Sequence, residues 1–77
     1  MNKSRRAELK KALSFLGQAR DIIEYCRDEE QDAYWNLPES LQESERGESM
    51  SECIDSMDEA VSSIDDCVAS LDEVIEG

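Results

Sequence analysis

The sequence contains no histidine, and it has little else on which common catalytic or metal-binding chemistry depends. Without histidine there is no Ser-His or Cys-His catalytic pair, no histidine-bearing zinc site and no di-iron site of the Glu-x-x-His type. The three glycines are isolated from one another, so there is no glycine-rich phosphate loop. The acidic residues follow a helical repeat rather than the loop of an EF-hand. We therefore expect no enzymatic activity, no cofactor and no bound metal.

Cysteine is sparse and long apolar runs are missing. Cys26, Cys53 and Cys67 are odd in number and lack C-x-x-C spacing, which argues against a disulfide framework and against a zinc or redox site. Cys53 and Cys67 fall in an apolar column of a helical repeat and are expected to be buried thiols. No apolar run reaches the length of a signal peptide or a membrane span. These observations favour a reducing, cytoplasmic setting.

Basic residues are scarce and unevenly placed. The chain of 77 residues has 20 acidic and 8 basic side chains and a net charge of −12. Residues 1–35 hold seven of each sign, whereas residues 49–77 hold nine acidic residues and no basic one. Such a chain repels phosphate backbones and anionic lipids, so direct binding of nucleic acid or membrane is not expected. High charge with few aromatic residues is typical of disorder, but the periodicity of the apolar residues argues against disorder.

A seven-residue repeat dominates the second half of the chain. It forms three apolar columns: Met50, Met57, Ile64, Leu71; then Ile54, Val61, Val68, Ile75; and then Cys53, Ala60, Cys67, Val74. The first two columns alternate in steps of four and three, as in the seam of a left-handed coiled coil. The third column widens the stripe, which suits a helix packed against more than one neighbour. Ser49 and Glu52 have capping-box spacing, so we expect a helix over about residues 49–76.

The first half predicts another long helix, over about residues 4–34. Its expected seam has a three-four spacing and consists of Leu9, Ala12, Leu16, Ala19, Ile23 and Cys26, with Leu13, Phe15 and Ile22 beside it. Residues 27–32 are all polar. The favoured interpretation is that the helix continues here past its partner into water, and the alternative is a contact site for another protein.

The linker, about residues 35–48, is long for a helical hairpin. It is therefore expected to have structure of its own or to contact a partner. Pro38 disfavours continuation of the first helix and could instead open a short helical turn, with Leu37 and Leu41 under the end of the bundle. The chain thus reads as a single domain, residues 1–77.

The distribution of charge favours an antiparallel hairpin. Lys3, Arg5, Arg6, Lys10 and Lys11 cluster at the start of the first helix, and Asp72, Glu73 and Glu76 lie at the end of the second. Each group opposes the dipole of its own helix, and an antiparallel arrangement makes the two groups neighbours of opposite sign. Two hairpins could then cover the wide apolar stripe by forming a homodimeric four-helix bundle. The core of this all-α oligomer would contain Leu9, Leu16, Ile23, Met57, Val61, Ile64, Val68 and Leu71.

Two features could bind a partner. An acidic ridge recurs at seven-residue intervals and consists of Asp58, Glu59, Asp65, Asp66, Asp72 and Glu73. It could mimic a nucleic acid on a basic protein surface, or it could be a solvated face that keeps a small bundle soluble. Tyr34 and Trp35 could anchor an interface, or they could close the open end of the bundle.

The centre of the chain resembles a group of phage proteins. This resemblance rests on two stretches, Asp28-Glu29-Glu30-Gln31-Asp32-Ala33-Tyr34 and Asn36-Leu37-Pro38-Glu39-Ser40-Leu41-Gln42-Glu43-Ser44-Glu45-Arg46-Gly47-Glu48. They are similar to small uncharacterised acidic helical-hairpin proteins of Gram-positive phages and mobile elements, with the linker pattern LPESLQ…S-x-R-G. The resemblance implies a bacterial host cell and brings no site residues. Small acidic phage proteins that inhibit host enzymes or CRISPR effectors offer an analogy only.

The sequence therefore predicts a non-enzymatic, homodimeric protein-interaction module. The alternative function is an acidic nucleic-acid mimic that inhibits a host nucleic-acid-binding enzyme or a CRISPR effector. Besides a second copy of itself, the expected partner is a host protein with a basic surface.

Overall fold

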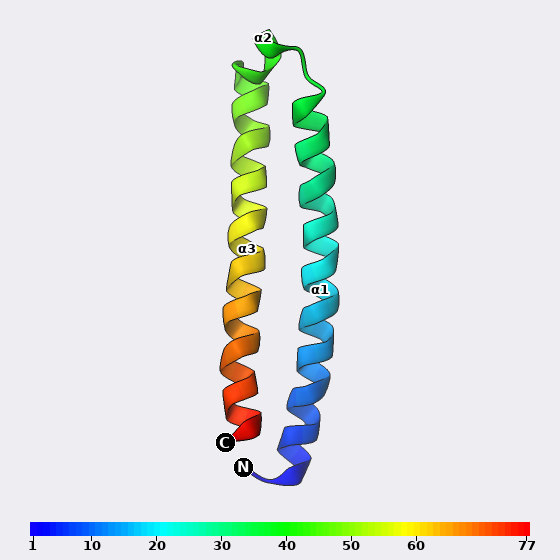
Figure 1. Ribbon diagram of the computed structural model, residues 1–77, viewed down its shortest axis with the longest axis vertical. Coiled ribbons are helices and arrows are strands. Elements are labelled where there is room, and N and C mark those ends of the chain that lie inside the picture. The colour runs from blue at the N-terminus through cyan, green and yellow to red at the C-terminus, as the bar shows by residue number, and fades with distance from the viewer.

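The computed structural model describes residues 1–77 as a hairpin of two long antiparallel helices (Figure 1). Helix α1 spans Lys3–Trp35, the short helix α2 spans Glu39–Gln42, and helix α3 spans Glu45–Glu76. The hairpin is 58 Å long and 15 by 13 Å across, with both chain termini at one end and α2 at the other. None of the helices is both long and apolar enough to cross a bilayer. The expected all-α helical hairpin is confirmed.

Local hydrogen bonds fix both ends of α1 and the short helix α2 that follows it. The side chain of Asn2 caps the start of α1 by accepting a bond of 2.8 Å from the backbone amide of Arg5. At the other end, the side-chain amide of Gln42 donates to the carbonyls of Tyr34 and Leu37 at 3.1 and 3.2 Å. The carbonyl of Pro38 accepts from the amide of Gln42 at 3.1 Å and so closes the turn of α2. The short helical turn expected after Pro38 is therefore present.

Helix α3 begins one turn earlier than the sequence predicted. Its N-cap is Ser44, in an extended conformation, and the amide of Glu48 donates to the Ser44 carbonyl at 2.9 Å. Ser49 lies inside the helix, so the expected capping box at Ser49 and Glu52 is wrong. Glu45 and Glu48 place negative charge in the first turn, where it stabilises the helix dipole. The linker is thereby reduced to residues 36–44.

The seam of α3 is as predicted, but one column of the α1 seam is not. All members of the first two α3 columns are buried or half-buried. In α1, Leu9, Leu16 and Ile23 are half-buried, whereas Ala19 and Cys26 are exposed. The second column of α1 is instead formed by Leu13, Arg20 and Arg27. Leu13 buries more apolar surface than an alanine would, and the stems of the two arginines can cover the seam while their charged ends reach its edge.

The polar residues 27–32 do not extend past the partner helix. Helix α3 runs beside them, because it begins early and is nearly as long as α1 (Figure 1). Arg27 bonds Asp58 of α3, and Glu30 is half-buried at a seam position. The favoured interpretation, a helix end surrounded by water, is therefore wrong for this segment.

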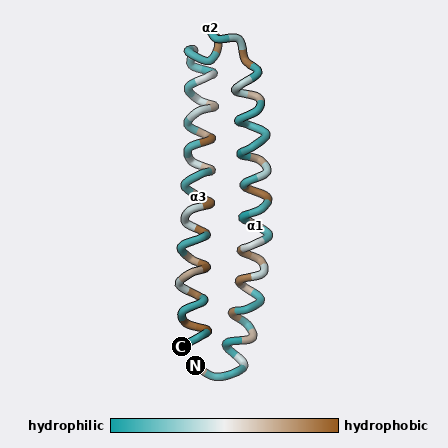
Figure 2. Tube along the Cα trace, in the orientation of Figure 1, coloured by the Kyte–Doolittle hydropathy of each residue, from teal (hydrophilic) through white to brown (hydrophobic).

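The packing between the two helices is thin. Apolar segments recur along both helices (Figure 2), but Ile54 is the sole buried hydrophobic side chain, with 8% of its surface exposed. All eight residues expected in an oligomer core are half-buried, and they already lie in the α1–α3 seam of the single hairpin. For a domain of this size, a single core rarely provides more than about 3–5 kcal/mol of stability. One hairpin alone is therefore marginally stable on physical grounds.

Truncation of the one buried side chain should be costly. We expect Ile54→Ala to reduce the free energy of unfolding by roughly 2–4 kcal/mol, because it removes buried methyl groups and leaves a cavity. Urea unfolding followed by circular dichroism measures this loss. Tyr25→Ala is the control, since Tyr25 is 63% exposed and should change stability little. Equal losses for the two variants would contradict the assignment of Ile54 to the core.

Candidate interaction surfaces

One edge of the seam is held by ion pairs between α1 and α3. Nε of Arg20 donates to Oδ1 of Asp65 at 2.7 Å, and Nε of Arg27 donates to Oδ1 of Asp58 at 2.8 Å. A second hydrogen bond joins Nη2 of Arg20 to Oδ2 of Asp65 at 3.4 Å. We call these four residues the charged edge. Both pairs are spaced by seven residues on each helix, so they are consistent with one and the same register of the hairpin.

The acidic partners keep the two arginines charged. The hydrogen bond that Arg20 donates to Asp65, followed by the negative charges of Asp65 and Glu24, raises the pKa of Arg20. Hydrogen bonds to Asp28 and then to Asp58 raise the pKa of Arg27. Arginine is a cation at any ordinary pH, so both guanidinium groups place fixed positive charge where α1 forms ion pairs with α3. Their contribution to stability is small, because exposed ion pairs are well solvated.

Neighbouring carboxylates on α3 should respond differently to neutralisation. We expect Asp65→Asn to reduce the melting temperature by at most about 5 °C, since it breaks a partly exposed ion pair. Asp66→Asn is the matched control, because Asp66 has no ion-pair partner and lies among like charges. It should leave the melting temperature unchanged or raise it slightly. If thermal unfolding showed a larger decrease in melting temperature for Asp66→Asn than for Asp65→Asn, the ion pair between Arg20 and Asp65 would not stabilise the hairpin.

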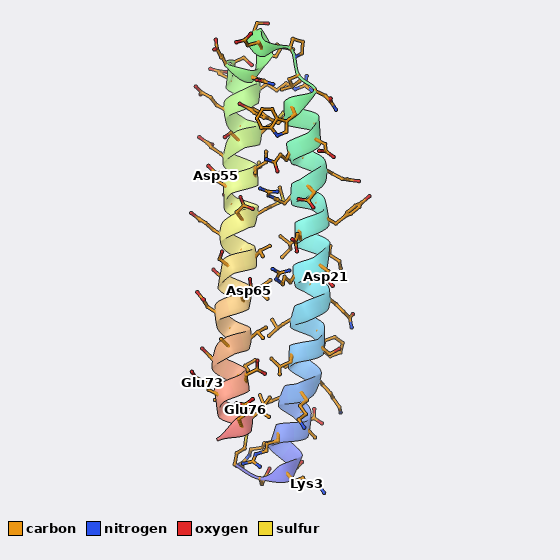
Figure 3. The ribbon with its side chains drawn as sticks, viewed as in Figure 1. Lys3, Asp21, Asp55, Asp65, Glu73 and Glu76 are labelled. Carbon is orange, nitrogen blue, oxygen red and sulfur yellow. The ribbon has the colours of Figure 1, made fainter.

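The acidic ridge is divided by this pairing. Asp58 and Asp65 of its inner file bond Arg27 and Arg20, whereas Asp72 of the same file has no ion-pair partner. The outer file, Glu59, Asp66 and Glu73, has no ion pair. Glu73 and Asp55 point away from α1 in Figure 3. A continuous double file of free carboxylates is therefore not present, and the carboxylates available to a partner are the outer file and Asp72.

The basic cluster at the start of α1 lies at the same end as the acidic end of α3. Lys3 and Glu76 are both at this end in Figure 3. No ion pair joins the two groups, and the inter-helix pairs lie further along the hairpin, at Arg20 and Arg27. Lys11 instead pairs with Glu8 of its own helix at 2.9 Å, and the buried Nε of Arg6 has no hydrogen-bond partner. The antiparallel direction was predicted correctly, but the ion pairs that join the two helices are not the expected ones.

The opposite edge of the seam leads to an exposed apolar face. Glu30 there lines a shallow groove with Ser56, Met57 and Cys53 of α3, while the charged edge lines a separate groove. Helical periodicity places the third α3 column at this edge of the seam, since Cys53 belongs to that column. The α1 residues that flank Leu16 and Ile23 lie at the same edge. We call this surface the apolar face, and it contains Ala12, Phe15, Ala19, Ile22 and Cys26 of α1 and Cys53, Ala60, Cys67 and Val74 of α3.

Large side chains on the apolar face are open to solvent. Phe15 is 68% exposed, Ile22 is 64% exposed, and Val74 is 42% exposed. Cys53 and Cys67 are also exposed, so their predicted burial is wrong for the single hairpin. Phe15 and Ile22 were expected beside the α1 seam, and both are exposed there. The three-four spacing of residues 12, 15, 19, 22 and 26 is the signal of a second apolar stripe on α1.

Tyr34 and Trp35 do not act together. Tyr34 is half-buried at a seam position, whereas Trp35 is 65% exposed. Their rings meet edge to face, with centroids 5.9 Å apart and an interplanar angle of 74°. Tyr34 thus helps to close the linker end of the hairpin, and Trp35 is the member of the pair that a partner could reach.

Two further observations bear on what chemistry the hairpin could support. No three His, Cys, Asp or Glu side chains are grouped so that they could hold a metal ion. Comparison of the chain with protein-family models, curated proteins and solved structures finds no match. Function is therefore inferred from the surfaces of the hairpin alone.

Proposed function

We propose that this protein is a non-catalytic protein-interaction module whose working unit is a homodimeric four-helix bundle. The observation that carries the proposal is the apolar face, on which Phe15 and Ile22 are exposed on the same side of the hairpin as Cys53 and Cys67. Contiguous exposed apolar surface with a polar surround is typical of a protein–protein interface. A second hairpin packed on this face would bury it.

The weak core of the hairpin also supports a dimer. A chain of 77 residues with a single buried hydrophobic side chain has less core than small domains normally need. Burial of the apolar face would add stability at about 25 cal/mol per Å² of apolar surface. Folding and dimerisation would then be coupled, as they are in many small helical proteins.

In this proposal the bundle offers two surfaces to another protein. The outer file, with Glu59, Asp66 and Glu73, stays exposed on α3 when the apolar face is covered. Trp35 stays exposed at the linker end. A host protein with a basic surface is the partner whose charge complements the outer file. We place this module in the cytoplasm of a bacterial host, as the sequence resemblance implies.

Sedimentation of the purified protein tests the proposal. We expect a single species of twice the 8.7 kDa chain mass at micromolar concentration. Helix content should fall on dilution as the dimer dissociates. A species of one chain mass that keeps its helix content at these concentrations would overturn the proposal.

A second candidate function, inhibition of a nucleic-acid-binding enzyme, is supported by the outer file alone. Its carboxylates have no basic neighbour on α3, since residues 47–77 contain no Lys or Arg. For a nuclease with a basic channel captured from a bacterial lysate, we expect DNA to compete with the protein and added salt to weaken binding steeply. Glu59→Gln with Asp66→Asn should reduce binding at least about tenfold, the loss of roughly 1.4 kcal/mol. Asp58→Asn is the control, and equal losses would contradict a role for the outer file.

A further inference from the structure

We infer that the two hairpins of the dimer are related by a two-fold axis parallel to their length. Helix α1 of each copy then packs against α3 of the other, and both α2 segments lie at the same end of the bundle. The inference rests on the proposed dimer. It specifies which of two symmetric arrangements joins the apolar faces, since an axis across the hairpins would instead pair α1 with α1 and α3 with α3.

The two halves of the apolar face differ in side-chain size. On α1 the face carries Phe15 and Ile22, seven residues apart. On α3 the face contains Cys53, Ala60, Cys67 and Val74, and a file of serines lies beside them at alternating steps of four and three, namely Ser49, Ser56, Ser63 and Ser70. Up to Ser70 these α3 residues are all small. Large side chains pack best against small ones, because facing layers can then interdigitate. The α1 half therefore complements the α3 half better than it complements itself.

The register of the hairpin brings the complementary residues to the same height. The residue numbers of Arg20 and Asp65 sum to 85, as do those of Arg27 and Asp58. Residues whose numbers sum to about 85 thus lie level with one another, and an axis parallel to the hairpin preserves these heights. Phe15 comes level with Ser70 of the second copy, and Ile22 comes level with Ser63. Each large side chain then faces a small one.

The charges favour the same arrangement. Residues 1–35 are neutral overall, whereas residues 49–77 carry nine acidic side chains and no basic one. A parallel axis places the neutral α1 of one copy against the acidic α3 of the other. An axis across the hairpins brings the two acidic helices together, and their repulsion would weaken the dimer.

The broad side of the hairpin, to which the apolar face belongs, is just large enough for a standard dimer interface. The broad side of the hairpin measures 58 by 15 Å, a planar area of roughly 870 Å², close to the ~800 Å² that each partner buries in a standard interface. Most of the length of the hairpin must therefore be used. With a parallel axis the two hairpins overlap along their full length without any axial shift.

Intermolecular nuclear Overhauser effects test the arrangement in the unaltered protein. A dimer mixed from isotope-labelled and unlabelled chains shows only contacts between copies when the spectra are isotope-filtered. We expect cross-peaks between the Ile22 methyl groups of one copy and the Ala60 methyl group of the other. Cross-peaks from Ile22 to α1 of the second copy, with none to α3, would overturn the inference.

The separation of the two linkers provides an independent measurement. A spin label is placed at Ser40→Cys in α2, in a variant with Cys26, Cys53 and Cys67 replaced by alanine. We expect a distance of about 30 Å or less, since packed helices lie 8–10 Å apart. Distances that approach the 58 Å length of the hairpin would overturn the inference. Failure of the dimer proposal itself is a separate outcome, because the unaltered protein would then sediment as a monomer.

Discussion

Replacement of Ile22 by Glu is expected to weaken dimerisation at least about 100-fold, a loss of roughly 3 kcal/mol. Ile22 is 64% exposed in the single hairpin and lies outside the α1–α3 seam. The substitution should therefore not disrupt the fold of the hairpin itself. In the dimer the carboxylate would be buried in an apolar interface twice, once from each copy. An unpaired polar group costs about 1–3 kcal/mol on burial, and a charge costs more. Sedimentation equilibrium over a range of concentrations measures the change.

Gln18→Glu is the control for this experiment. Gln18 is exposed on the same helix and lies outside the apolar face, so it adds the same charge without entering the proposed interface. We expect the dimer of this variant to be weakened little at moderate salt. If both variants dissociate equally, charge alone is responsible and the apolar face is not the interface. If neither dissociates, the two copies meet elsewhere.

The strict repeat of α3 explains why its role in the fold was predictable. Its columns contain Met, Ile, Val and Leu at every seam position from Met50 to Ile75, and no charged residue interrupts them. Only one face of such a helix can turn inward, so both seam columns were predicted correctly. Cys53, Cys67 and Val74 of the third column remain exposed, since two helices bury little more than two columns of each other.

Helix α1 was less predictable because two of its seam positions are arginines. A hydrophobic pattern counts Arg20 and Arg27 as outward residues, and it therefore assigned Ala19 and Cys26 to the seam. At these two seam positions Asp65 and Asp58 of α3 accept hydrogen bonds from the guanidinium groups at 2.7 and 2.8 Å. That pairing depends on the register of two helices, which the sequence of either one alone does not contain.

The same limit applies to the candidate surfaces. The acidic ridge was visible as a sequence repeat, but its division into paired and free carboxylates follows from which face of α1 lies against α3. The apolar face was visible only in part, through the third α3 column. Phe15 and Ile22 belong to this face because Leu13, and not Ala12, shares the second α1 column with Arg20 and Arg27.

Substitution of Gly47 by Ala is expected to destabilise the hairpin by roughly 2–3 kcal/mol, the upper part of the range of about 1–3 kcal/mol for an overpacked site. Gly47 is buried in the first turns of α3, where the helix passes α2. A Cβ atom built on it would lie 2.0 Å from the carbonyl oxygen of Gln42 and 2.6 Å from that of Leu41. Both neighbours are backbone atoms, so the clash can be relieved only if α2 moves away or if α3 begins later. Urea unfolding followed by circular dichroism measures the loss.

Gly17→Ala in α1 is the control, and it is expected to increase the stability of the hairpin instead of decreasing it. A Cβ atom at Gly17 meets nothing within 4 Å. Alanine is favoured over glycine by about 1 kcal/mol inside a helix, so this variant should be more stable than the parent protein. For Gly47 the same propensity gain is present and is outweighed by the clash with α2. If Gly47→Ala were also stabilising, α2 would not lie against α3 in solution, and the linker would lack the close contact that ends the hairpin.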